Sequence, residues 1–162
     1  MRRSYGQYCG LARALEIVGE RWALLIVRDL LVGPRRFGQL QQGLPRIPSN
    51  VLSARLRELE EHGVVRRRAL PRPGGGVVYE LTERGRQLEP AVLSLGRWGA
   101  LALDEPRPGE IVTEDSLVMA LRTAYRPDRT HPPTTYELRV GDLVVHAVVS
   151  VDGPRVAAGP AP

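Results

Sequence analysis

SNVLSARLRELEEHGVVRRRAL, residues 49–70, decides the fold of this chain. Leu52, Leu56 and Leu59 recur at the three- and four-residue spacing of one helix face, and a His-Gly pair follows as a typical helix end. The pattern then changes to a β-prone segment that carries Arg66–Arg68. The stretch therefore predicts a helix that runs directly into a basic strand.

Three helices are predicted before this stretch. Apolar residues at helical spacing indicate an amphipathic helix over Leu11–Val18. Residues Trp22–Leu31 are apolar almost all round, which is typical of a buried central helix. A short third helix is expected over residues 37–44, and a turn then leads into the leucine-patterned helix.

A second strand and a last helix are predicted after the basic strand. Alternation over Val77–Leu81 indicates a strand that completes a hairpin, and its tip is rich in proline and glycine. Thr82 is a good N-cap for a helix over Glu83–Leu103, which Pro90 should kink or shift. The predicted fold class is mainly α with a small β-hairpin wing, a winged helix-turn-helix, followed by a small α+β segment.

Charge divides the chain into a basic and an acidic part. Residues 1–103 contain 17 arginines and 9 acidic residues, whereas residues 104–162 contain 6 arginines and 9 acidic residues. All of the basic residues are arginine, whose planar guanidinium group suits phosphates and guanine edges. The first part therefore suits contact with nucleic acid, and the alternative from charge alone is a basic face that is merely solvated.

Composition excludes several other classes of protein. No apolar run reaches the ~18 residues of a membrane span, and no signal peptide precedes the first helix, so we expect a cytoplasmic protein without a membrane partner. One cysteine cannot form a disulfide framework or a cysteine metal cage. His62, His131 and His146 are not joined to paired carboxylates, a phosphate loop or a metal-ligand spacing. We therefore expect no enzyme activity, no cofactor and no metal.

The face of the leucine-patterned helix opposite the leucines provides candidate DNA contacts. Ser49, Asn50, Ser53 and Arg57 fall on or near this face. Asparagine can bind adenine through two hydrogen bonds, and arginine can bind guanine or hold a phosphate. The alternative is that Ser49 is only an N-cap and Arg57 only a solvated charge.

The stretch from Cys9 to about Leu101 resembles the HxlR family of bacterial winged-helix regulators. Short motifs carry this resemblance in the same order and at the same spacing. They are Cys9, Val18-Gly19-Glu20-Arg21-Trp22, Gly33-Pro34-Arg35-Arg36-Phe37, Leu52-Ser53-Ala54-Arg55-Leu56-Arg57-Glu58-Leu59-Glu60-Glu61, Tyr79-Glu80-Leu81-Thr82 with Gly85, and Trp98-Gly99.

The resemblance implies a homodimer formed through the first and last helices. Leu11, Leu15, Leu95 and Trp98 would then be interface residues, although Trp98 could equally cap the core of its own domain. Two recognition helices would bind a palindromic or nearly palindromic operator, with half-sites about 34 Å apart.

Further arginines are candidate phosphate contacts in the light of this resemblance. They are Arg35 and Arg36 at the start of the third helix, and Arg67, Arg68 and Arg72 on the hairpin. Arg55 has two open interpretations, a phosphate contact or an intramolecular pair with Glu58 or Glu20. The family usually has Ser-Pro before the recognition helix, but this chain has Pro48-Ser49, so we expect the N-cap to move by one residue, which bears on whether Asn50 contacts a base.

Cys9 is a candidate redox sensor, because some members of the family carry a reactive thiol at this position. A cycle with one cysteine needs a Cys9–Cys9 bond between protomers or a mixed disulfide with a small thiol. Arg13 could lower the thiol pKa. The alternative is a half-buried packing residue.

The last third of the chain is predicted to be a separate small segment. We expect a winged-helix domain over residues 1–103, a linker over 104–110 and an α+β accessory over 111–162. A helix over Ser116–Tyr125 and a hairpin around Gly141-Asp142 are predicted, without a further element to close a sheet. The hairpin weakly resembles the start of a sterol-carrier-like domain, so the segment either senses a ligand or is structural padding.

The predicted function is a transcriptional regulator that binds double-stranded DNA as a homodimer, modulated by a thiol reaction or a small-molecule effector. The alternative is a winged-helix protein-interaction module without sequence-specific DNA binding. Salt separates the two, because DNA binding weakens steeply as salt rises.

Overall fold

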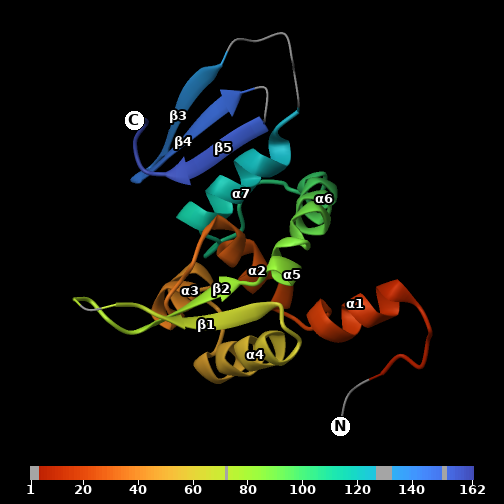
Figure 1. Cartoon of the computed structure of the whole chain (residues 1–162). Helices are drawn as coiled ribbons and strands as arrows, with labels where there is room; N and C mark the ends of the chain where they lie inside the picture. Colours follow the sequence, from red (N-terminus) through yellow and green to blue (C-terminus); the bar gives the residue numbers. More distant parts are fainter. Residues whose placement is uncertain (1–3, 72, 127–132, 151–152) are drawn as a thin grey trace. The chain divides into compact units, whose positions relative to one another are not determined.

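The computed structural model describes residues 4–71, 73–126, 133–150 and 153–162, which fall into two compact units (Figure 1). The first unit is Met1–Glu89 and the second is Pro90–Pro162. Within the described ranges, no helix is both long and apolar enough to cross a membrane. His131, expected in a proline-rich loop, lies outside the described residues. Each unit has its own sheet and core and is described by itself.

The first unit has the predicted order of four helices and a hairpin. Its elements are α1 (Gly10–Val18), α2 (Ala23–Val32), α3 (Phe37–Gly43), α4 (Ser49–Glu61), β1 (Val65–Ala69), β2 (Val77–Leu81) and α5 (Glu83–Arg86). The predicted helix end at His62 is confirmed, because this residue is the C-cap of α4.

The core of the first unit forms around α2. This helix contacts α3, α4 and β2, and its Ile26 and Val27 are fully buried. The leucine face of α4 lies in the same core, since Leu52, Leu56 and Leu59 are each almost completely buried. Burial of a leucine side chain contributes about 1.5–3 kcal/mol, so this face fixes the orientation of α4.

The hairpin is anchored at its base and exposed toward its tip. β1 and β2 pair antiparallel from Val65 opposite Leu81 to Ala69 opposite Val77. Val65 and Leu81 are buried, whereas the rest of β1 is exposed. Arg35, just before α3, exchanges two backbone hydrogen bonds with Tyr79 of β2, so the chain entering α3 is attached to the wing.

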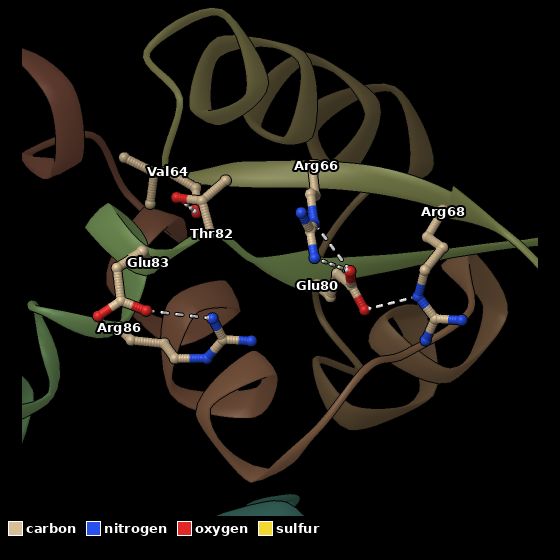
Figure 2. Close-up of polar contacts among 7 residues, drawn as sticks. All are labelled: Val64, Arg66, Arg68, Glu80, Thr82, Glu83 and Arg86. Atoms are coloured by element: carbon tan, nitrogen blue, oxygen red, sulfur yellow. Dashed lines mark hydrogen bonds and ion pairs between the residues drawn. The ribbon is translucent and has the colours of Figure 1, made fainter.

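A close backbone approach holds α5 against the residue before β1 (Figure 2). Thr82 is the N-cap of α5, as predicted, and its hydroxyl accepts a hydrogen bond from the Gly85 amide at 3.1 Å. The Thr82 amide donates to the Val64 carbonyl at 3.0 Å (Figure 2). A Cβ atom on Gly85 would lie 2.1 Å from that carbonyl oxygen. Only glycine allows α5 to pack this closely.

The prediction of one helix over Glu83–Leu103 is wrong. The structure has α5 and a separate α6 (Glu89–Ala100), with Gln87 and Leu88 between them. Pro90 does shift the helix start, because it lies in the first turn of α6, where an amide hydrogen has no helical partner. The segment predicted as one helix is therefore two helices, α5 and α6.

The second unit contains α6, one further helix and a three-stranded antiparallel sheet. These elements are α7 (Glu114–Ala124), β3 (Thr134–Val140), β4 (Leu143–Ser150) and β5 (Gly153–Ala158). α7 packs on β4 and β5, and Val118, Met119, Val145 and Val156 form a small core. The predicted helix and the Gly141-Asp142 turn are confirmed; Val151, expected in the second strand, lies outside the described residues.

The expectation that no element follows the hairpin is wrong, because β5 adds a third strand beside β4. Pro154 is unfavourable inside a sheet, since proline cannot donate to a ladder. It is tolerated here because β5 is an edge strand that pairs only with β4.

α6 belongs to the second unit through its contact with α7. The Arg97 guanidinium donates to the Thr123 carbonyl at 3.0 Å, and a Cβ atom on Gly96 would lie 3.2 Å from the Thr123 side chain. The boundary between compact units therefore precedes the predicted linker over 104–110, which has no helix or strand.

We predict that Gly85→Ala destabilises the protein by about 1–3 kcal/mol, because the added methyl group overlaps the Val64 carbonyl. Urea unfolding measures this change. Gly38→Ala is the matched control, since a Cβ atom there meets nothing within 4 Å in α3. Equal stability of the two variants would contradict the close approach.

Candidate nucleic-acid interface

The exposed face of α4 is the centre of the candidate interface. Ser49, Asn50, Ser53 and Arg57 are all exposed, while the three leucines on the opposite face are buried. In the described part of the chain, Arg57 makes no hydrogen bond or ion pair with another residue. The side chains that the sequence placed on one outer face therefore do lie together.

The start of α4 differs from the N-cap alternative considered for Ser49. The N-cap is Pro48, which has an extended backbone and no capping side chain, and Ser49 is the first helical residue. Ser49 as N-cap is therefore wrong. The first amides of α4 have no cap from the Pro48 side chain, and free amides at a helix start favour binding of an anion such as a phosphate.

The wing holds two arginines on one carboxylate (Figure 2). Glu80 of β2 accepts hydrogen bonds from the Nε atoms of Arg66 and Arg68, each at 2.8 Å. The Glu80 side chain is only 9% exposed, whereas Arg66 is 61% exposed. Hydrogen bonds from Arg68 first and Arg66 second lower the pKa of Glu80, against its burial. The two guanidinium groups are thus fixed in place while still reaching solvent.

Arg66 and Glu80 were not predicted as site residues. Arg66 lies directly opposite Glu80 in the hairpin register. Residues directly opposite in an antiparallel pair share one face of the sheet, so the register would have paired them. The family motif Tyr79-Glu80-Leu81-Thr82 could have pointed to Glu80.

Other predicted phosphate contacts are held by the protein itself. Arg67 pairs with Glu60 of α4 at 3.1 Å, and the Arg36 guanidinium donates to the Gly74 carbonyl at 2.9 Å near the hairpin tip. Arg35 is held by its backbone bonds to β2, and its guanidinium donates to the Pro34 carbonyl at 3.0 Å. Arg72 lies outside the described residues.

Of the two alternatives predicted for Arg55, the structure contains the intramolecular pair. Its Nη1 atom lies 2.6 Å from Glu58 and 3.7 Å from Glu20, and its side chain is only 18% exposed. The pair with Glu58 joins successive turns of α4. The Arg55–Glu58 pair therefore stabilises α4.

The residues expected at a dimer interface are exposed in the single chain. Leu11 and Leu15 lie on α1, and Leu95 and Trp98 lie on α6. Trp98 is 75% exposed, so the alternative that it caps its own core is wrong. Isolated large apolar groups are common on surfaces, but several on one helix indicate a partner.

Cys9 is the exposed N-cap of α1 rather than a half-buried packing residue. The backbone amides of Ala12 first and Leu11 second lower the pKa of its thiol. Arg13, expected to have this effect, instead pairs with Glu16 at 2.8 Å. The helix start itself therefore favours the thiolate.

Comparisons with known proteins agree with this geometry. The model of a family described as HxlR-like helix-turn-helix matches residues 17–106. The chain is 34% identical over 100 residues to sll1512 of Synechocystis, an uncharacterized HTH-type transcriptional regulator, covering 62% of this chain and 74% of that one. It is 48% identical over 98 residues to Rv3095 of Mycobacterium tuberculosis, a protein with the same description, covering 60% of each.

Solved structures show the same relationship. The redox regulator HypR in its oxidized form matches with a TM-score of 0.56 and 34% identity, over 59% of this chain and 99% of that one. The reduced form of the transcriptional regulator YodB from Bacillus subtilis matches with a TM-score of 0.53 and 31% identity, over 62% and 100%.

We predict that Glu80→Gln lowers the free energy of unfolding by about 1 kcal/mol at pH 7, because two charge-assisted hydrogen bonds weaken. The Glu80 pKa is lowered by folding, so this stability is present above the ordinary glutamate pKa and is lost as pH falls through the folded value. Urea unfolding from pH 7 to pH 3 should show the variant and the natural protein converging.

Glu83→Gln is the matched control, since Glu83 is 87% exposed and pairs with Arg86 only at 3.8 Å (Figure 2). Such a surface pair contributes little, so its removal should leave stability unchanged. An equal loss in both variants would show that the Glu80 contacts add nothing specific.

We predict that Cys9 reacts with iodoacetamide at a lower pH than a free cysteine derivative does. The amides at the start of α1 lower its pKa, so a larger thiolate fraction is present at a given pH. The rate of alkylation against pH, with N-acetylcysteine as reference, measures this. A profile that coincides with the reference would refute the effect of the helix start.

Proposed function

The chain belongs to the HxlR-like helix-turn-helix family, and on that premise we propose that it is a transcriptional regulator that binds duplex DNA as a homodimer. The observation that carries the proposal is the exposed polar face of α4 with the basic wing directly after it. The relatives sll1512 and Rv3095 are named as HTH-type transcriptional regulators, which supports the same class of function.

α4 is proposed as the recognition helix in the major groove. An α-helix fits this groove, and the N-terminal residues of a recognition helix contact base edges. Asn50 can bind adenine, and Arg57, two turns further along, can bind guanine or a phosphate. The first amides of α4 add a phosphate contact.

The wing is proposed to contact the phosphate backbone beside α4. Arg66 and Arg68 share the single carboxylate of Glu80, so this cluster retains a positive charge. Guanidinium groups with most of their donors still free can bind phosphate while Glu80 orients them. Such contacts position the protein without reading sequence.

Dimerisation is proposed through the apolar residues of α1 and α6. Leu11 and Leu15 on α1, and Leu95 and Trp98 on α6, are exposed without a partner in the described chain. A two-fold dimer would place two α4 helices on an inverted repeat with half-sites about 34 Å apart. An effector is proposed to modulate binding, through the Cys9 thiol or through a small ligand.

The test of this function is selection of bound fragments from a random DNA pool by the full chain, at two salt concentrations. We expect an inverted repeat whose affinity falls as salt rises, because phosphate contacts release counterions. Recovery of no sequence above background, or binding insensitive to salt, would refute the DNA-binding proposal and favour a protein partner.

Arg57→Ala should weaken binding to the selected repeat about tenfold or more, because a base or phosphate contact is lost from the centre of the interface. Arg107→Ala is the matched control, since it removes the same charge from the segment outside the helices and strands. Gel-shift titration measures both. Equal weakening would mean that only net charge matters, and would remove Arg57 from the contact surface.

A further inference from the structure

An open cavity of about 280 Å³ lies in the first unit, between α1 and the segment that begins with α5. On the α1 side it is lined by Arg13, Ala14 and Ile17. Ala14 lies three residues after Leu11, and Val18, which also lines the cavity, lies three residues after Leu15, so the cavity borders the face of α1 that carries these proposed dimer contacts. The cavity and the dimer contacts therefore adjoin each other along α1.

The opposite wall of the cavity is built from Val64, Arg84 and Leu88. Its position is fixed, because the Thr82 amide bonds to the Val64 carbonyl and Gly85 allows α5 to lie against that carbonyl. Arg84 lies in the sequence between Thr82 and Gly85, the two residues that contact the Val64 carbonyl. Its backbone is therefore held at the edge of the cavity.

The lining combines apolar walls with positive charge. Ala14, Ile17, Val64 and Leu88 supply apolar surface, and two guanidinium groups lie beside it. Glu16 neutralises Arg13 at 2.8 Å, whereas Arg84 is exposed and makes no hydrogen bond or ion pair within the described ranges. No carboxylate belongs to the described lining. The uncompensated charge in the lining is thus that of Arg84.

We propose that this cavity binds a small organic carboxylate with an apolar tail. A guanidinium group binds a carboxylate through two parallel hydrogen bonds, and Arg84 is placed to do so. The apolar walls would cover the tail, and a volume near the lower end of ligand pockets, which span ~300–1,000 Å³, selects a small molecule.

This site deepens the proposed function, since it rests on that function for its role as the place where an effector binds. A bound carboxylate would touch α1, which carries the proposed dimer contacts, and Val64, which directly precedes the first strand of the wing. One ligand can therefore bias both the dimer helix and the root of the wing.

The test uses the full chain without DNA and two named probes, octanoate and 3-phenylpropionate, in calorimetric titrations. At least one should bind saturably, and at least tenfold more tightly than its neutral amide. Arg84→Ala should weaken carboxylate binding tenfold or more. Arg86→Ala is the matched control, because Arg86 is on the same short helix but does not line the cavity, and it should change affinity less than twofold.

Gln87→Trp is a second variant, which fills the cavity with a side chain from the wall opposite α1, away from the proposed dimer contacts. It should abolish probe binding while light scattering still reports a dimer. Loss of the dimer would show that a second copy occupies the cavity and would overturn the proposal. So would no saturable binding of either probe, no preference over the amides, or equal effects of Arg84→Ala and Arg86→Ala.

Failure of the site and failure of the proposed function give different results. Probe binding with no selected DNA repeat would overturn the DNA-binding function alone. A selected repeat with no probe binding would overturn the carboxylate site alone.

Discussion

Burial of the leucine face of α4 against the core around α2 is the constraint on which the candidate interface depends. Leu52, Leu56 and Leu59 leave almost no surface to solvent, so α4 cannot rotate without exposing apolar area. Because a helix is rigid, fixing the orientation of one face also fixes the orientation of the opposite face. The polar residues there are thus positioned by packing that involves none of them.

Electrostatic pairing then decides which of the many arginines are available to a partner. A count of charges makes the first part strongly basic, but Arg55 and Arg67 are paired with glutamates of α4. Glu80 is different, because one carboxylate serves two guanidinium groups and leaves a positive charge on the wing. The basic surface is therefore smaller than the sequence suggests, and more rigidly oriented.

Periodicity in the sequence predicts the elements of the first unit because each of them buries one face. Periodicity fails to predict elements whose ends or existence depend on a local feature of the backbone, such as a proline. α5 and α6 are separate because Pro90 shifts the start of α6, and β5 carries Pro154 at a sheet edge, a position where proline is tolerated. The cavity could not be predicted at all, since it joins two segments about seventy residues apart, around Arg13 and Arg84.

The exposed apolar residues of α1 and α6 support the proposed dimer. α6 has no buried residue, although an amphipathic helix gains most of its stability by burying one face. Burial of its Leu95 and Trp98 against a partner would therefore stabilise α6, and burial of Leu11 and Leu15 would do the same for α1. The second copy that we propose would supply the same surfaces in the same number, which a two-fold interface requires. In that proposal, dimerisation stabilises the helices that the single chain leaves exposed, and it pairs the two helices proposed to read DNA.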